Sequence, residues 1–301
     1  MLSICIPIYK FDVRLLIGQL TEQMNNIKEK VELVLIDDAS NSEFLNINQE
    51  TCETHHYIKL DKNIGRSRIR NLFLEYASYD NLLFLDCDSI ITESDFIEKY
   101  LFQLQKKENN IVCGGRIYPS NPPEKKKMLR WKYGIKKESQ TAENRQLLPN
   151  HSFMTNNFLI KRILLEEIKF DERLSNYGHE DTLFGFELMK AGIPITHIHN
   201  PVGNGDIEDN DVFLEKTEAG VENLALILNY MNHDSRLIAM VKLLRANRKL
   251  QKMKLSGFVL LIYSVFRKPI LLSLNRGPIS LYIFDFYKLS ILLEAQKAFN
   301  K

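Results

Sequence analysis

The stretch of sequence that decides the fold is residues 81–88, which read NLLFLDCD. Four apolar residues, Leu82 to Leu85, follow one another without interruption, which is typical of a strand buried on both faces of a parallel sheet. The run ends in two carboxylates at alternate positions, Asp86 and Asp88. Because open α/β sheets bind ligands beyond the carboxyl ends of their strands, these acids lie where chemistry is expected.

Strands and helices alternate on both sides of this segment. Short apolar runs predict strands, and apolar residues at helical spacing predict helices. On this basis we expect strands over 2–8, 31–36, 56–60, 111–118 and 193–198, and helices over 13–27, 66–76, 94–107, 158–168 and 179–191. Residues 119–149 are polar and basic, and we interpret them as one long loop. The alternation indicates an α/β protein with a doubly wound sheet flanked by helices.

Domain boundaries follow from this order and from composition. We expect an α/β domain over residues 1–235, with one half over 1–110 and the other over 111–235. A basic, amphipathic helical tail is expected over 236–301. That tail carries 13 lysines and arginines against two acidic residues, whereas the first 235 residues carry 27 against 36. The tail either packs on the catalytic body or anchors the protein on an anionic membrane surface.

Other features of the composition limit the class of protein. Four cysteines without close pairing or metal-type spacing predict a reducing compartment. The first residues form a strand and not a signal peptide, so we expect a cytoplasmic protein, with a peripheral place on the inner face of the plasma membrane if the tail is an anchor. The longest apolar run, 255–266, is shorter than the roughly 20 residues that a membrane span needs. The net charge of +2 favours no particular partner, and we expect no nucleic acid.

Two further acidic clusters accompany Asp86 and Asp88. Asp37 and Asp38 end the second strand, where a carboxylate can accept a hydrogen bond from a nucleobase imide. Glu180 and Asp181 begin a helix, where an acid can remove the proton of an incoming hydroxyl. Each cluster alone also fits a structural role, because acids are common in turns and at the first turns of helices.

Taken in order, these motifs resemble those of the inverting glycosyltransferases of family 2, which have the GT-A fold. The residues that carry the resemblance are Pro7-x-Tyr9, Asp37-Asp38-x-Ser40, Asn63-x-Gly65, Arg70-Asn71, Asp86-x-Asp88 and Glu180-Asp181. Together they cover about residues 1–200 of the chain. Residues 177–185, which read YGHEDTLFG, are similar to a signature of the chondroitin-polymerase-like branch.

The resemblance implies that residues 1–235 are a catalytic domain, with the nucleotide-binding half over 1–110 and the acceptor half over 111–235. It implies a UDP-sugar as donor and a glycan or lipid-linked hydroxyl as acceptor. The transferred group would be a hexose or an N-acetylhexosamine. Asp38, with Asp37 beside it, would face the uracil, and Asp86 would contact the ribose or the sugar. Arg70 would lie near the diphosphate, and Asp88 would bind Mn²⁺ or Mg²⁺. Pro7, Tyr9, Asn63 and Gly65 would complete the donor site.

The acceptor side follows from the same resemblance. Asp181 would be the general base, and Glu180 beside it would contact the acceptor. Asn156 and Asn157 resemble the acceptor loop of the family, although neutral amides also serve to hold loops. Trp131 is either a sugar-stacking residue or a core tryptophan.

A third protein ligand for the metal is less clearly marked. The family often places a histidine shortly after the last strand, and this chain has His197 and His199 but none after Val202. We take His199 as the ligand, with a structural histidine as the alternative.

Two other classes of function remain at this point. A sugar-phosphate nucleotidylyltransferase would need a glycine-rich phosphate loop after the first strand, and residues 8–11 contain no glycine. A non-catalytic glycan-binding homologue would not need intact acids in all three clusters.

Overall fold

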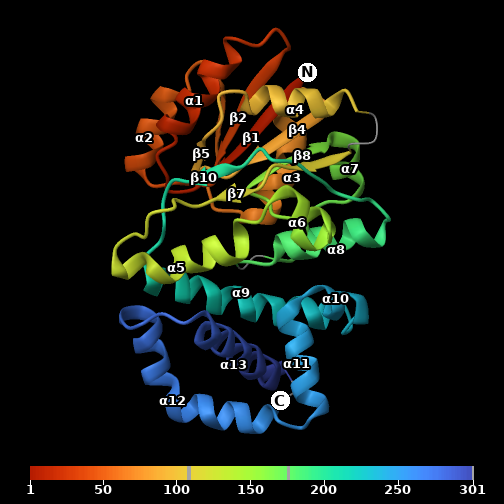
Figure 1. Cartoon of the computed structure of the whole chain (residues 1–301). Coiled ribbons are helices and arrows are strands. Elements are labelled where there is room, and N and C mark those ends of the chain that lie inside the picture. The colour runs from red at the N-terminus through yellow and green to blue at the C-terminus, as the bar shows by residue number, and fades with distance from the viewer. Residues whose placement is uncertain (107–109, 175–176, 300–301) are drawn as a thin grey trace. The chain divides into compact units, whose positions relative to one another are not determined.

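The computed structural model describes residues 1–106, 110–174 and 177–299. The chain divides into two compact units (Figure 1). The first consists of Met1–Pro119, Glu138–Ser175 and Glu180–Asp206, and the second of Ser120–Lys137, Asn176–His179 and Ile207–Lys301. We describe each unit by itself.

A seven-stranded mixed sheet forms the centre of the first unit, with the order β3-β2-β1-β4-β8-β6-β9. The strands are β1 (Leu2–Ile8), β2 (Val31–Asp37), β3 (His56–Lys59), β4 (Asn81–Leu85), β6 (Ile111–Cys113), β8 (Asn157–Lys161) and β9 (Thr196–His197). The first four strands are parallel, and β8 runs antiparallel to both of its neighbours, β4 and β6. The predicted doubly wound α/β architecture is confirmed.

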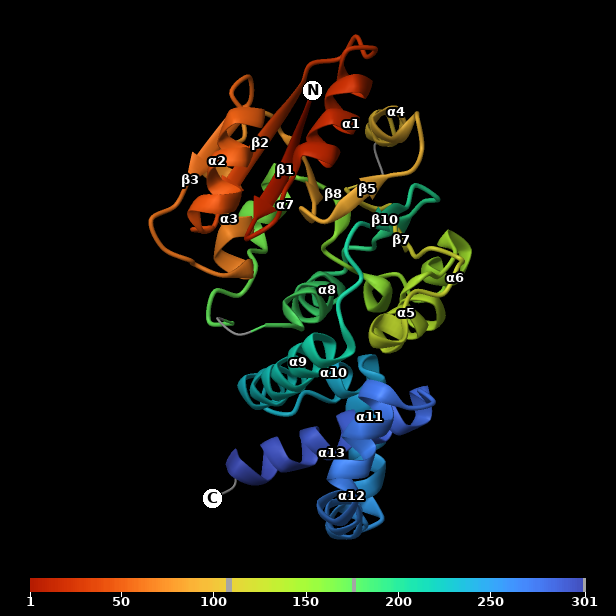
Figure 2. The same cartoon turned by 90° about the vertical axis from the view of Figure 1, so that its left-hand side faces the viewer.

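Helices cover both faces of this sheet (Figure 2). They are α1 (Arg14–Met24), α2 (Ser42–Thr51), α3 (Arg66–Tyr76), α4 (Phe96–Leu104), α6 (Ala142–Gln146), α7 (Arg162–Glu167) and α8 (Glu180–Lys190). Successive strand residues point to opposite faces, so Ile4 and Ile6 pack with α1 and α4, whereas Cys5 packs with α3, α7 and α8. Because both faces are covered, the central strands are apolar throughout.

A second sheet of three short strands lies beyond the end of β4. Its order is β5-β10-β7, formed by β5 (Ser89–Ile91), β10 (Val202–Asn204) and β7 (Arg116–Ile117). The strand that we expected over 111–118 is divided into β6 and β7 by Gly114 and Gly115. Gly115 has a φ of +94°, and a Cβ atom on Gly114 would lie 2.3 Å from the carbonyl oxygen of Asn200. The backbone therefore turns here in a way that other residues do not allow.

Two predictions about local structure were wrong. The helix expected over 158–168 is a strand, β8, followed by the short helix α7. Its apolar residues Phe158, Leu159 and Ile160 fill positions between β4 and β6, so pairing within the sheet overrides the helical pattern. The loop expected over 119–149 contains helical turns, namely η1 (Lys125–Lys127), α5 (Met128–Tyr133), a π-helical turn (Gly134–Glu138) and α6.

The second unit is helical. Besides α5 it contains α9 (Asn210–Tyr230), α10 (Ser235–Met240), α11 (Lys242–Lys252), α12 (Ser256–Arg276) and α13 (Leu281–Phe299). An aromatic cluster forms part of its core, with the ring of Phe213 lying 5.6 Å from Tyr133 and 5.5 Å from Phe284. Residues 207–235, which we expected to belong to the catalytic domain, form part of this unit.

Candidate active site

Asp86 and Asp88 follow β4 in a turn that backbone hydrogen bonds hold at both ends. The N–H of Asp86 donates to the carbonyl oxygen of Asn156 at 3.2 Å, and the N–H of Gly205 donates to that of Asp88 at 2.8 Å. Within the turn the N–H of Ser89 donates to the carbonyl oxygen of Asp86. The two carboxylates are therefore fixed at the edge of the sheet, and each is only partly exposed, at 25% and 28%.

Arg70 on α3 connects two of the acidic clusters. Its guanidinium is 2% exposed, with Nη2 3.1 Å from Oδ1 of Asp86 and Nη1 3.5 Å from Oε1 of Glu180. Arg66, one helical turn earlier, places its own Nη1 3.4 Å from the same oxygen of Glu180. The acid at the end of β4 and the acid at the start of α8 thus meet on one buried cation.

Glu180 and Asp181 are neighbours in sequence but differ in protonation. Burial favours the neutral form of Glu180, but the charges of Arg66 and Arg70 outweigh it, so that the pKa of Glu180 is lowered. Burial and the negative charge of Glu180 together raise the pKa of Asp181 to about 7, against the opposing effect of hydrogen bonds from the backbone N–H and hydroxyl of Thr182. Two acids whose environments separate their pKa values in this way are typical of acid–base sites.

Asp88 forms an ion pair that the sequence did not predict. Nη2 of Arg116, on β7, lies 2.9 Å from Oδ2 of Asp88, and the arginine side chain is only 12% exposed. Burial raises the pKa of Asp88, and the charge of Arg116 opposes that shift. One carboxylate oxygen of Asp88 therefore already faces a cation.

The donor set around Asp88 fits a divalent metal held together with a substrate. Across residues 1–106, 110–174 and 177–299, no three His, Cys, Asp or Glu side chains are grouped so as to hold a metal ion. Mg²⁺ and similar hard cations are usually bound by one or two carboxylates together with substrate phosphates and water. Asp86 and Asp88 provide carboxylates of this kind, so the diphosphate of a donor would have to supply the remaining oxygens.

The two candidate histidines lie in different surroundings. His197 is buried, with Nδ1 2.8 Å from Nη1 of Arg145 and Nε2 2.9 Å from the carbonyl oxygen of Pro149. Burial lowers its pKa to about 4. Since both ring nitrogens have protein partners, His197 is a structural residue. His199 is exposed.

Asp38 forms one structure with the Asn63-x-Gly65 motif. Its two carboxylate oxygens accept hydrogen bonds from the backbone N–H groups of Ile64 and Gly65, at 2.7 and 3.1 Å, and its carbonyl oxygen accepts one from the amide of Asn63 at 3.2 Å. Burial nevertheless raises the pKa of Asp38, against the effect of these hydrogen bonds. Gly65, with a φ of +84°, starts α3 and so places Arg66 and Arg70.

Asp37 is fully buried, and both of its carboxylate oxygens accept hydrogen bonds from within the protein. Its carboxylate accepts a hydrogen bond from the hydroxyl of Tyr57 at 2.9 Å and one from the N–H of Ser40 at 2.7 Å. Pro7 lies in β1 opposite Ile36, and Tyr9, just after this strand, is 46% exposed. Of these residues, Tyr9 offers the most surface to a ligand.

The residues predicted for the acceptor side differ in how many hydrogen bonds their side chains already make within the protein. Asn157 is locked, because its Oδ1 accepts from the hydroxyl of Tyr100 and its Nδ2 donates to the carbonyl oxygens of Gly115 and Asn200. The Nδ2 atom of Asn156 is buried and has no hydrogen-bond partner among the described residues. Trp131 is half-buried in α5 and belongs to the second unit.

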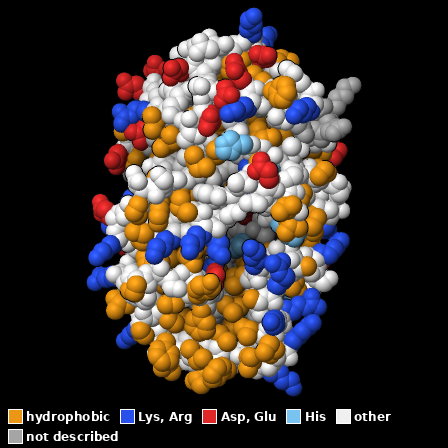
Figure 3. All heavy atoms as spheres, in the orientation of Figure 1, with side chains coloured by type: hydrophobic (Ala, Val, Ile, Leu, Met, Phe, Trp, Pro, Cys, Tyr) orange, Lys and Arg blue, Asp and Glu red, His pale blue; other side chains and the backbone are white. Residues whose placement is uncertain are grey.

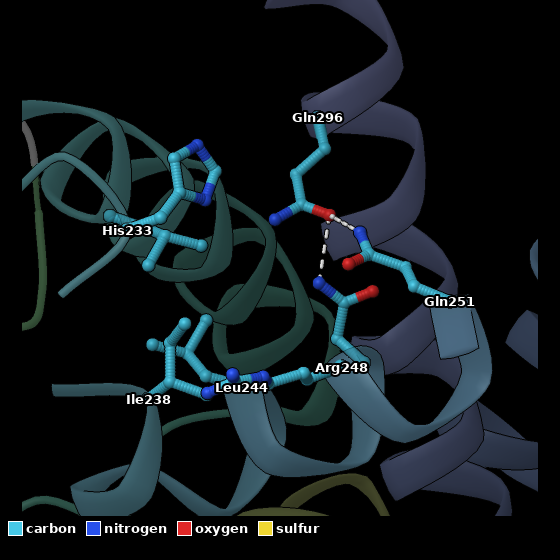
Figure 4. A pocket seen from close by; sticks show the side chains of 8 residues that line it. His233, Ile238, Leu244, Arg248, Gln251 and Gln296 are labelled. Carbon is cyan, nitrogen blue, oxygen red and sulfur yellow. Dashed lines mark hydrogen bonds between the residues drawn. The ribbon is translucent and has the colours of Figure 1, made fainter. Parts of the chain in front are cut away.

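A cavity of about 220 Å³ lies within the second unit (Figure 4). Its lining comes from α9, α10, α11, α13 and the turn after α9, and consists of Leu228, His233, Ile238, Leu244, Asn247, Arg248, Gln251 and Gln296. The amides of Asn247 and Gln251 both donate to Oε1 of Gln296. Because the lining contains no carboxylate, the cavity is not the acidic site described above.

Sequence reasoning missed the two arginines that accompany the acids. Arg66 is one turn before Arg70 on a predicted helix, so the i, i+4 spacing was the available signal. Arg116 interrupts an apolar strand, and a charged residue at such a position is rarely buried without a partner. Which acid would pair with it depends on β10 and β5, and neither strand was predicted.

Comparisons with known proteins agree with this geometry. Residues 3–169 match the family model described as glycosyl transferase family 2. The chain is 28% identical over 194 residues to an uncharacterised glycosyltransferase of Haemophilus influenzae, covering 63% of this chain and 72% of that protein. It is 24% identical over 193 residues to the chondroitin synthase of Pasteurella multocida, covering 54% of this chain but only 20% of that longer protein.

Solved structures share the fold at low sequence identity. A mannosyltransferase from Pyrobaculum calidifontis, in complex with GDP-mannose and Mn²⁺, superposes with a TM-score of 0.62 at 12% identity, over 100% of this chain and 88% of that one. A glucosyl-3-phosphoglycerate synthase from Mycobacterium tuberculosis, in complex with Mg²⁺ and UDP, superposes with a TM-score of 0.52 at 13% identity, over 76% and 78%.

Fold and site together define a glycosyltransferase of the GT-A type. Because the family model matches more than half of its length, the chain belongs to glycosyl transferase family 2.

Proposed function

We propose that this glycosyltransferase moves a hexose or N-acetylhexosamine from a UDP-sugar to a hydroxyl group, with inversion at the anomeric carbon. One observation carries the proposal. Arg70 holds Asp86 and Glu180 on a single buried cation, and Asp181, next to Glu180, has a pKa of about 7. A base with a pKa close to the working pH is the most effective at removing a proton from a hydroxyl.

The chemistry would be one displacement. Asp181 accepts the proton of the acceptor hydroxyl while that oxygen forms a bond to the anomeric carbon. The bond between this carbon and the diphosphate oxygen breaks, and UDP leaves with the bonding electron pair. Glu180 would stay ionised and contact the acceptor, and Asn156, whose buried Nδ2 has no partner among the described residues, would donate to a hydroxyl of the acceptor.

The donor would bind along the ends of β1, β2 and β4. Asp38 would accept from the uracil with Asn63 and Gly65 fixing its turn, and Tyr9 would contact the nucleotide next to Pro7. Asp37 enters as a positioning residue, since both of its oxygens serve the protein. Asp86 would contact the ribose or the sugar, and Arg70 would order the diphosphate end.

Mn²⁺ or Mg²⁺ would be held by Asp88, with His199 as a further ligand, and would neutralise the diphosphate when bound. Arg116 already supplies one positive charge at Asp88. The metal ions in the two solved neighbours support this cofactor class.

The acceptor is proposed to be a glycan or a lipid-linked hydroxyl. Residues 177–185 and the identity to chondroitin synthase support an enzyme of the chondroitin-polymerase-like branch, active in polysaccharide biosynthesis. The basic tail supports an anionic membrane surface as a partner, and hence a cytoplasmic enzyme that works at the inner face of the plasma membrane.

The test is release of the nucleoside diphosphate in Mn²⁺ or Mg²⁺, measured as UDP from a panel of UDP-sugars and as GDP from GDP-mannose, which represents a competing donor class. We expect hydrolysis of at least one UDP-sugar and a loss of about 10²–10⁴-fold in Asp181→Asn. Asp234→Asn is the matched control, because Asp234 is an acid at a helix start in the second unit and pairs with Arg236. An inactive wild type with every donor and both metals, or an active Asp181→Asn, would contradict the proposal.

A further inference from the structure

Helix α12 has an apolar face that the protein does not cover. Among the described residues it is the one helix long and apolar enough to cross a membrane by length and composition, yet only 11% of its apolar window is buried. A core helix of the same composition would be mostly buried. Figure 3 shows the result, a field of apolar side chains on the second unit around α12.

The exposed residues of α12 form a stripe. Phe258, Leu261, Val265 and Leu272 are 60–66% exposed, and their spacing of three, four and seven places them on one side of the helix. The residues that are buried lie on the other side, namely Val259, Tyr263 and Leu274. The inner side packs against α13, α9 and α11. The helix therefore packs on its unit by one face, and the other face is exposed in the part of the chain that the structure describes.

Charge around this face is of one sign. Residues 236–284 contain ten lysines and arginines and no aspartate or glutamate. Those that are exposed along α11, the following turn and α12 include Arg245, Arg248, Lys249, Lys252, Lys254, Lys268 and Arg276. An apolar face on a segment whose own charged residues, from 236 to 284, are all cations is complementary to a surface that is anionic outside and apolar beneath, which is an anionic lipid leaflet.

The residues in the middle of α12 indicate whether the helix lies on a membrane or crosses it. Arg267 and Lys268 stand there, and a charged side chain at the centre of a bilayer is costly. Arg267 also forms an ion pair of 3.7 Å with Glu218 on α9, which ties α12 to its own unit. Pro269 follows, and the helix bends in its middle (Figure 1), as expected where a proline removes a backbone donor. These features favour a helix in the plane of the interface.

We infer that the outer face of α12 inserts into an anionic leaflet in the plane of the membrane, while Lys254 and Lys268 bind lipid phosphates. The inference deepens the proposed function, because it names the surface that would bring the enzyme to a lipid-linked acceptor. Membrane binding can be measured without catalysis. An experiment can therefore contradict the membrane inference and leave the proposed transferase activity intact, or the reverse.

The experiment is co-sedimentation of the whole chain with vesicles of phosphatidylcholine alone or of phosphatidylcholine with phosphatidylglycerol. We expect binding to the anionic vesicles, weaker binding at high salt and little binding to the neutral vesicles. Lys254→Gln and Lys268→Gln should each lower the partition coefficient about fivefold. Leu261→Gln with Val265→Gln should lower it by at least ~10-fold, because apolar burial is lost.

The matched control is Leu147→Gln with Leu148→Gln, since these leucines are 78% and 56% exposed in the first unit. Binding by this variant should equal that of wild type. Circular dichroism shows whether each variant is folded, and UDP release without lipid should be the same in all of them. Equal binding by the Leu261/Val265 variant and wild type would overturn the inference. So would sedimentation in lipid-free solution as a dimer that this variant abolishes, because the face would then join two copies of the chain.

Discussion

At the scale of single residues, the proposed function rests on the different surroundings of Glu180 and Asp181. Two arginines lower the pKa of Glu180 and so keep it ionised. Burial and the charge of Glu180 raise the pKa of Asp181 to about 7. The sequence predicted both acids by their motif. It could not predict their difference, because the arginines lie 110 or more residues earlier in the chain.

This difference predicts a pH dependence. The base must be ionised to accept a proton, so kcat/KM for UDP release should fall about tenfold per pH unit below pH 7 and level off above it. Glu180 contributes nothing in this range, because its lowered pKa keeps it ionised. Steady-state rates measured from pH 5 to 9 in buffers of constant ionic strength provide the check. A flat profile between pH 5 and 7 would mean that Asp181 is not the group that titrates.

Other residues show that a motif does not predict the separate hydrogen bonds of its members. Asn156 and Asn157 are adjacent and were expected to act together, but one amide is fully engaged in the protein and the other has a buried donor without a partner. Similarly, Asp37 and Asp38 diverge, since the first faces Tyr57 and the second faces the turn before α3. Motifs identify such pairs, whereas the hydrogen bonds that separate their members come from distant strands.

At the scale of elements, α3 is the part that assembles the site. Its start is fixed by Gly65 bonded to Asp38, and its buried face carries Arg70 to Asp86 and Glu180. The helix was predicted over its full length, because caps and apolar spacing are local signals. Strand β8 was missed, because a short apolar run fits a helix or a strand and only pairing with β4 and β6 decides.

The role of α3 predicts that two of its arginines contribute differently to stability and to activity. Arg70→Gln removes a buried cation from the partly exposed Asp86 and leaves the buried Glu180 with Arg66 alone, so we expect a loss of roughly 3–5 kcal/mol in the free energy of unfolding together with loss of UDP release. Arg68→Gln is the control on the same helix, because Arg68 is exposed and lies 3.9 Å from an exposed Glu172. Its stability should change by less than about 0.5 kcal/mol. Urea denaturation followed by circular dichroism measures both, and equal stabilities would refute the assembling role of Arg70.

At the scale of the whole molecule, the chain separates an acidic catalytic unit from a basic helical one. The sequence predicted this polarity of charge from residue 236 onward, and the helices of the tail. It did not predict that residues 120–137 and 207–235 belong to the helical unit, because that membership depends on packing between helices distant in sequence, such as α5 with α9 and α9 with α13. The position of the acids at 37–38 and at 86 and 88, at the ends of β2 and β4, did follow from the sequence, because an apolar run that stops at a carboxylate is a local signal.

The central claim is that Asp181 directs one displacement with inversion. Water replaces the acceptor when a donor is hydrolysed, so the sugar released from an α-linked UDP-sugar records the stereochemistry before it equilibrates. Proton NMR during the first minutes of hydrolysis measures its anomeric configuration. The account predicts that the β-anomer appears first and that its formation is lost in Asp181→Asn. Initial release of the α-anomer, with its rate unchanged in this variant, would contradict the account.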